Sequence, residues 1–122
     1  MTIKEAPPGL LPNPYDKGYT LIEPVVKAEV VVSSSEQLRA GIKADIKTLK
    51  DQKKPLKVIL DLSEIEFIAP MGIRALIAEQ NELKKNKGEI VLANVPKRVA
   101  GALDFMGVVQ NFKTITLGTP KT

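Results

Sequence analysis

The stretch from Lys57 to Gly88 places the strongest constraint on how this chain can fold. It opens with an almost unbroken apolar run, Val58 to Leu62, and closes with apolar residues at helical spacing. Such a run suits a strand covered on both faces, as in a parallel or mixed sheet with helices on each side. The residues between the strand and the helix are then expected to form a short exposed loop that connects the two elements. We expect the function to lie in this loop.

The second half of the stretch predicts an amphipathic helix that begins at a proline. Pro70 suits the first helical position, because its φ is preset and it has no N–H to leave unpaired. Ala69, at the capping position, gives up about 1 kcal/mol relative to Asp or Ser. Lysines close the helix, and Gly88 is available for a left-handed cap. The loop is therefore explained about equally well as a proline-initiated helix or as a functional patch. The apolar stripe of the helix is Ile73, Leu76, Ile77 and Leu83.

The rest of the chain predicts alternating strands and helices. We expect strands over 19–23, 25–32, 89–95 and 114–117. Pro24 confines the first of these to a sheet edge or ends it. A helix is expected from near Ser35, because serines and a following glutamine resemble a capping box, and another from Pro96 to Gly107. This alternation predicts an α/β fold with a largely parallel core.

Length and proline content predict the domain organisation. A chain of 122 residues is long enough for one domain with a core. Four prolines fall between residues 6 and 18, where they exclude a helix or a central strand. We therefore expect a proline-rich N-terminal arm over 1–18, a domain over 19–118 and a tail over 119–122.

Composition excludes several kinds of chemistry. The chain has no cysteine and no histidine, which argues against zinc sites, disulfides and histidine-dependent nucleophilic catalysis. It contains no phosphate-binding glycine motif. Asp61, Glu64 and Glu66 are close in sequence and remain an alternative for carboxylate chemistry or ligand binding, although strand-end capping explains them as well. We expect no enzyme activity, no catalytic residue, no cofactor and no metal.

The charge pattern bears on the partner. The net charge is +4, and lysines at 43, 47, 50 and 54 form a stripe beside the apolar face of the first helix. A solvated helix face explains that stripe best, and nucleic-acid binding is a minor alternative, since few aromatic residues are available for stacking. The first residues lack an apolar targeting segment, and no apolar run approaches a membrane span. We expect a cytoplasmic protein that binds no specific nucleic acid and does not insert into a membrane.

Residues 58–73 resemble the signature of STAS domains, the fold of bacterial anti-sigma factor antagonists. In that family an apolar strand ending in Asp-Leu-Ser leads into Phe, an apolar residue, Asp-Ser-Ser-Gly-Leu and a helix. Here Asp61-Leu62-Ser63 is followed by Phe67-Ile68, a tripeptide and Gly72-Ile73. The resemblance continues through 89–96 and 103–107 and covers most of residues 20–117. It implies a single α/β domain with a mostly parallel or mixed sheet of four or five strands, packed with helices.

The resemblance also implies a function, partner switching. Such domains dock on a serine-kinase-type anti-sigma factor, and phosphorylation of a serine at the helix start breaks the contact. This chain has Ala69-Pro70-Met71 in place of Asp-Ser-Ser, and Pro70 stands at the phosphoacceptor position without a hydroxyl. The domain is therefore expected to be either a binder that is never phosphorylated there or a binder of a different partner.

We accordingly predict a non-catalytic protein-interaction module that binds an anti-sigma factor or a related regulator. An accessory subunit of a membrane transporter complex is the alternative, because STAS domains also occur in transporters. The predicted partner-binding residues are those of the loop and of two neighbouring turns: Ile68, Ala69, Pro70, Met71, Gly72, Ile73, Arg74, Ser33, Ser34 and Asn94.

Overall fold

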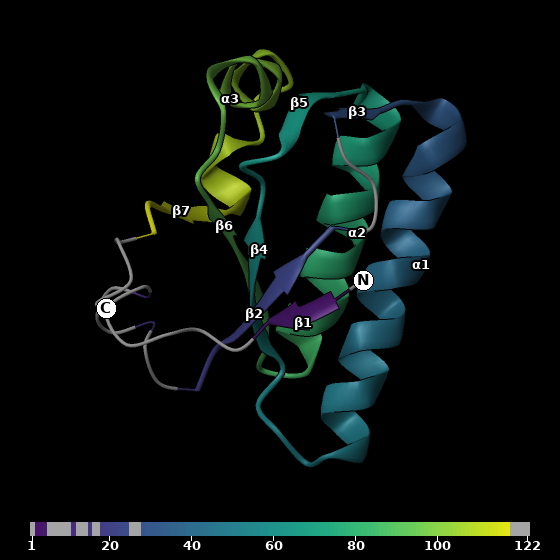
Figure 1. The fold of residues 1–122 in the computed structure, drawn as a ribbon, viewed down its shortest axis with the longest axis vertical. Coiled ribbons are helices and arrows are strands. Elements are labelled where there is room, and N and C mark those ends of the chain that lie inside the picture. Colours follow the sequence, from purple (N-terminus) through teal and green to yellow (C-terminus); the bar gives the residue numbers. More distant parts are fainter. Residues whose placement is uncertain (1, 5–10, 12–14, 16–17, 25–27, 118–122) are drawn as a thin grey trace.

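A five-stranded mixed sheet forms the centre of the molecule (Figure 1). The computed structural model describes residues 2–4, 11, 15, 18–24 and 28–117. The strands lie in the order β1-β2-β4-β6-β7; β1 is antiparallel to β2, and the other neighbours pair in parallel. The predicted α/β fold with a mostly parallel sheet is confirmed. The strands are β1 (Thr2–Lys4), β2 (Thr20–Glu23), β4 (Lys57–Asp61), β6 (Glu89–Ala93) and β7 (Lys113–Ile115).

Three α-helices pack against this sheet. They are α1 (Val32–Asp51), α2 (Pro70–Lys85) and α3 (Lys97–Phe105), and the short 3-10 helix η1 (Val109–Asn111) follows α3. Figure 1 shows α1 and α2 side by side along the sheet, with α3 across its upper end. The predicted apolar stripes are buried as expected except for Ile77, which is half-buried, because they fill the layer between α1, α2 and the sheet. The largest buried side chains of this layer include Leu38, Ile42, Leu49, Leu60, Ile73 and Leu76.

We predicted helices on both faces of the sheet, but the second face is covered by other parts of the chain. Leu21, Ile59 and Val91 point to this face and are buried. In the part of the chain that the structure describes, their cover comes from side chains outside the regular elements. These are Leu11, Tyr15, Tyr19 and Leu117, together with Ile115 of β7.

At the start of the domain, one predicted boundary needs correction and another is confirmed. Helix α1 begins at Val32, three residues before the expected start at Ser35, and Val31 is its N-cap. The serines act inside the first turn: the Val31 N–H donates to Ser34 Oγ at 2.8 Å, and Ser35 Oγ donates to the Val31 carbonyl at 2.7 Å. Strand β2 ends at Glu23, directly before Pro24, and it lies between β1 and β4 rather than at the edge of the sheet. Of the two outcomes predicted for Pro24, the end of the strand is therefore the one that occurs.

The ends of α2 and α3 follow the predicted pattern with two differences. Gly107 takes φ +68° and ends α3, as predicted, whereas Pro96 is the N-cap residue of α3 rather than its first residue. After α2, Lys87 has the left-handed backbone, with φ +61°, in place of Gly88. Gly88 is needed for a different reason, since a Cβ there would lie 2.2 Å from the Leu56 carbonyl oxygen.

The segment after β4 is not a continuous loop, and this part of the prediction is wrong. After a tight turn, Ile65–Ile68 form strand β5, which pairs in parallel with β3 (Ala28–Val30) in a second, two-stranded sheet. The strand was missed because its alternation covers only four residues and its partner lies more than thirty positions earlier in the chain. Residues 25–27 of the strand expected over 25–32 lie outside the described residues.

Candidate functional site

The two-stranded sheet brings the starts of α1 and α2 together. Helix α1 follows β3, and α2 follows β5, so that Val31 and Ala69 are the two N-cap residues. The Ala69 N–H donates to the Val30 carbonyl at 2.7 Å, which fixes the start of α2 to the end of β3. Neither N-cap side chain carries an oxygen, and neither makes a capping hydrogen bond. The site therefore combines two neighbouring helix N-termini with an apolar covering. Figure 1 shows this end at the top of the molecule, next to α3.

Gly72 makes this close approach possible. A Cβ at this position would lie 2.8 Å from Val30 Cγ1 and 2.9 Å from Ile68 Cγ1, closer than real Cβ contacts. It would also lie 3.3 Å from Ser35 Oγ, on the first turn of α1. The glycine of the signature thus has a packing role, because it lets the first turn of α2 lie against β3, β5 and α1.

The predicted loop residues divide into an exposed and a buried group. Pro70, Met71 and Arg74 are exposed, and 45% of the Met71 surface is accessible. The other loop residues face the core and cannot offer much surface to a partner: Ile68, Ala69, Gly72 and Ile73. Val31 was not predicted, yet it is 40% exposed beside the start of α2. The signal that could have found it is an apolar residue at a position that usually carries a polar cap.

Two of the residues predicted as partner contacts in the neighbouring turns, Ser34 and Asn94, make hydrogen bonds within the domain. Ser34 lies half-buried in the first turn of α1, where its hydroxyl accepts the Val31 N–H. Ser33 lies in the same turn, and its side chain is outside the described part of the structure. Asn94 follows β6 in the left-handed region, with φ +52°, and its Oδ1 accepts the Leu117 N–H at 2.9 Å. Asn94 therefore lies at the same end of the sheet, with its side-chain oxygen engaged in holding the chain after β7.

Two arginines lie near the apolar surface of the site. Neither α1 nor α2 has an acidic residue in its first turn, where it would offset the positive end of the helix dipole. Arg74 is exposed on α2, and the Arg98 guanidinium lies 5.4 Å from the centre of the Phe67 ring of β5. An apolar centre with arginines beside it suits a partner surface that presents apolar and acidic side chains.

Of the three carboxylates at and just after the end of β4, Asp61 has a structural role. Asp61 Oδ1 accepts the Ser63 N–H at 3.0 Å, which caps the turn between β4 and β5, and Glu66 is exposed on β5. No group of three or more acidic, histidine or cysteine residues within the described ranges could hold a metal ion. Strand-end capping, one of the two explanations given by the sequence, is the role that Asp61 takes.

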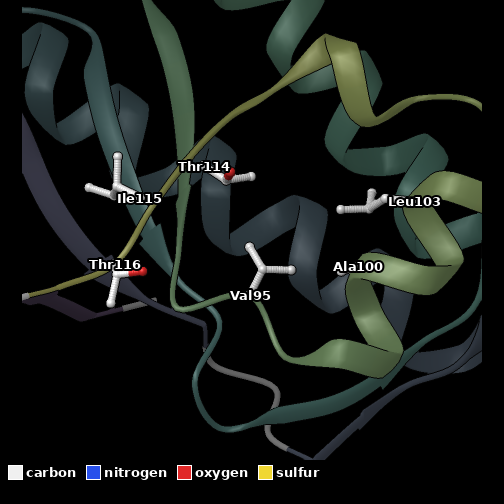
Figure 2. Close-up of a pocket in the computed structure, with 6 residues that line it drawn as sticks. All are labelled: Val95, Ala100, Leu103, Thr114, Ile115 and Thr116. Carbon is white, nitrogen blue, oxygen red and sulfur yellow. The ribbon is translucent and has the colours of Figure 1, made fainter.

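A pocket of about 370 Å³ lies between α3 and β7, outside the loop (Figure 2). Figure 2 shows aliphatic side chains and two threonine hydroxyls around it, and none of its lining side chains titrates. It offers no acid, base or strong nucleophile. Its lining residues are Val95, Ala100, Leu103, Thr114, Ile115 and Thr116.

The mixed sheet, the small β3–β5 sheet and the proline-started α2 define an α/β domain of a known architecture. The sequence profile of the STAS domain matches residues 25–117, and the chain belongs to the STAS domain family. The resemblance stated from the sequence is thereby confirmed. None of the helices in the described part of the chain is long and apolar enough to cross a bilayer.

Relatives of two kinds share this fold. The chain is 26% identical over 80 residues to the "Putative anti-sigma factor antagonist BtrV" of Bordetella bronchiseptica, a match that covers 66% of this chain and 65% of that protein. The anti-sigma factor antagonist SpoIIAA in its unphosphorylated form superimposes with a TM-score of 0.61 at 21% identity, covering 79% of this chain and 78% of that one. At this identity the likeness shows the fold alone.

Transporter-associated structures are equally similar in shape. A sulfate transporter family protein from Wolinella succinogenes gives a TM-score of 0.64 at 19% identity, covering 81% of this chain and 77% of that one. The murine anion transporter Slc26a9 gives 0.68 at 26% identity, and the match covers 82% of this chain but only 16% of the transporter. The fold is therefore common to antagonists and to transporter domains, and it does not decide between the two roles.

Proposed function

We propose that this chain is a non-catalytic protein-interaction module that acts like an anti-sigma factor antagonist and cannot be switched off by phosphorylation at the start of α2. One observation carries the proposal. An exposed apolar surface, formed by Val31, Pro70 and Met71, covers the two helix starts at the position where the family signature has a phosphoacceptor serine. Pro70 has no hydroxyl, so a kinase has nothing to modify there.

The physical argument starts from the effect of a phosphate at this place. A group with a charge near −2 is compatible with helix N-termini but disrupts a dry apolar contact. With Pro70 the contact stays dry at all times, and the domain binds without that interruption. The proposed partner is a serine-kinase-type anti-sigma factor or a related cytoplasmic regulator, and its contact surface is apolar with an acidic rim.

The proposal assigns different roles to the residues of the loop. Direct contact is assigned to Val31, Pro70, Met71 and Arg74, which are exposed. Ile68, Ala69, Gly72 and Ile73 are buried and position the exposed residues. The turn residues Ser33, Ser34 and Asn94 remain proposed secondary contacts.

A charge placed in the apolar centre tests this surface. The partner is first captured from the cells that make the protein, and its affinity is then measured for the wild type and for Met71→Glu. Loss of a central contact residue weakens such interfaces by about 2 kcal/mol, or about 30-fold. Gln52→Glu adds the same charge at an exposed site at the other end of α1 and is the matched control. Equal affinities of Met71→Glu and the wild type, with both folded, would remove the site from the proposal.

A second experiment tests whether the partner is a kinase. Pro70→Ser restores a hydroxyl at the family position, and Pro70→Ala removes the ring without adding one. If the captured partner is a serine kinase of this type, it will phosphorylate Pro70→Ser and leave the wild type and Pro70→Ala unmodified there. Phosphate incorporation located by mass spectrometry is the readout. No modification of Pro70→Ser by a partner that binds it would argue for a different class of regulator.

A second candidate function is an accessory subunit of a membrane transport complex. The 26% identity to the murine anion transporter Slc26a9 favours it. Purification in mild detergent at high salt separates the two functions, because a subunit then remains with an integral membrane protein. An antagonist leaves with its regulator instead.

A further inference from the structure

Two lysine-rich turns lie at the end of the molecule opposite the starts of α1 and α2. One comprises the end of α1 and the residues after it, 50–54, and the other comprises the end of α2 and the residues after it, 84–87; we call them together the lysine end. Figure 1 shows both turns at the bottom of the view, while β3, β5 and α3 lie at the top. The turns are joined, because the Glu89 N–H donates to the Leu56 carbonyl at 3.1 Å and Gly88 packs against the same oxygen.

The charge of the whole chain is concentrated there. The lysine end carries six lysines and one acid, Asp51, a net charge of +5. Since the chain as a whole is +4, the remaining residues sum to −1. All six lysines are exposed, and none forms an ion pair with a carboxylate of the described residues. They are Lys50, Lys53, Lys54, Lys84, Lys85 and Lys87.

The backbone of both turns gives a second, independent observation. Lys53 has φ +57° and Lys87 has φ +61°, in the left-handed region that glycine or asparagine usually occupies after a helix. Each turn is closed by the same kind of hydrogen bond. The Lys54 N–H donates to the Leu49 carbonyl at 2.9 Å, and the Gly88 N–H donates to the Leu83 carbonyl at 2.8 Å. Folding alone would favour glycine at both positions. At both positions the chain has a lysine in place of glycine, although a lysine in the left-handed region strains the backbone.

We propose that the lysine end binds the surface of an anionic lipid membrane. An anionic leaflet attracts clusters of four to eight basic residues, and each lysine near the surface contributes about 1 kcal/mol. The lysine end contains no arginine and no aromatic residue. It therefore lacks the bidentate phosphate contacts and the base stacking that nucleic-acid sites use. Attachment by this end leaves the loop at the opposite end free for a protein partner, so the two sites can be occupied together.

The test uses the full chain and vesicles of phosphatidylcholine, with or without about one third of phosphatidylglycerol. Binding is followed by vesicle sedimentation over a range of salt concentrations. We expect binding to the anionic vesicles only, with an affinity that falls steeply as salt rises, because exposed charges are screened within about 10 Å at 0.1 M salt. Equal binding to both kinds of vesicle, or none to either at low salt, would overturn the proposal.

Replacing Lys53 and Lys87, the two lysines with left-handed backbone, should weaken vesicle binding without lowering the stability of the fold. In Lys53→Gly with Lys87→Gly, vesicle affinity should fall about 25-fold, at about fivefold for each lysine removed from an anionic surface. The thermal midpoint should stay the same or rise, because glycine relieves the left-handed backbone. A loss of binding through unfolding would lower the midpoint and is distinguished in this way. Lys54→Gln with Lys84→Gln removes two charges from ordinary backbone and should weaken binding equally.

A matched control removes two charges from the other end of the molecule. Lys97 and Arg98 are exposed on the first turn of α3, and Lys97→Gln with Arg98→Gln should change vesicle affinity less than about threefold. If this control loses as much as the lysine-end variants, the effect reflects net charge and the proposal fails. It also fails if duplex DNA at the same salt binds more tightly than the anionic vesicles with the same dependence on the lysine end, which would assign this surface to nucleic acid.

Discussion

At the scale of single residues, two glycines of this chain should respond in opposite directions to the same substitution. Gly72 lies where a Cβ would meet Val30 and Ile68 at less than 3 Å, and the added methyl group must displace packed side chains. We expect Gly72→Ala to lower the free energy of unfolding by about 1–3 kcal/mol, the usual cost of overpacking. Equilibrium denaturation in urea measures the change.

Gly101 is the control for that substitution. It lies exposed in α3, and a Cβ there would meet nothing within 4 Å. Gly101→Ala should stabilise the protein by about 1 kcal/mol, because alanine restricts the unfolded chain and favours the helix. If both substitutions changed stability in the same direction, the close packing of Gly72 against β3 and β5 would not be what requires glycine there.

At the scale of elements, α1 holds a buried carboxylate that its helical pattern did not predict. Asp45 is only 6% exposed, and its Oδ2 is buried without a hydrogen-bond partner among the described residues. Burial raises the pKa of Asp45, because desolvation disfavours the charged form. Asp45→Asn keeps the shape and removes the charge, and it should stabilise the protein by about 1 kcal/mol at pH 7.

The pH dependence of that gain follows from the direction of the shift. A carboxyl group whose pKa is raised by folding adds most to stability below its unfolded pKa and loses that contribution as pH rises. The advantage of Asp45→Asn should therefore be largest at neutral pH and shrink toward zero below about pH 4. Denaturation curves of both proteins at several pH values decide the matter. An advantage that is constant with pH would mean that the carboxylate is not the cause.

The same elements show how far the sequence could predict the fold. The α2 start at Pro70 and the α3 end at Gly107 follow from local backbone chemistry, and both were predicted. Strand β5 was not, because four residues carry too little periodicity and its partner strand is distant in sequence. The exposed Val31 was missed for a related reason. Its apolar character at a helix start is visible in the sequence, but its place beside α2 depends on the β3–β5 pairing.

At the scale of the whole molecule, the two faces of the sheet are stabilised by different means. Helices α1 and α2 cover one face, whereas side chains from before β2 and from after β7 cover the other. Tyr15 packs edge-on against Tyr19, with ring centres 5.0 Å apart, and the Tyr19 hydroxyl donates to Glu89 at the start of β6. This contact ties the residues before β2 to the middle of the sheet. The STAS profile matches residues 25–117, so Leu11, Tyr15 and Tyr19 lie before the matched part of the chain, whereas Ile115 and Leu117 lie within it.

The cover should therefore stabilise the domain without being needed for its topology. In Leu11→Ala with Tyr15→Ala, we expect a loss of about 2–3 kcal/mol, less than for fully buried residues because both side chains are only partly buried. Binding of a hydrophobic dye should rise, because Leu21, Ile59 and Val91 lose their cover. Phe105→Ala removes an aromatic ring that is 93% exposed and should change stability by less than about 0.5 kcal/mol. If the double variant changed stability no more than Phe105→Ala, the second face would not depend on the residues before β2. The β2–β4–β6 sheet would then be stabilised from the helix side alone.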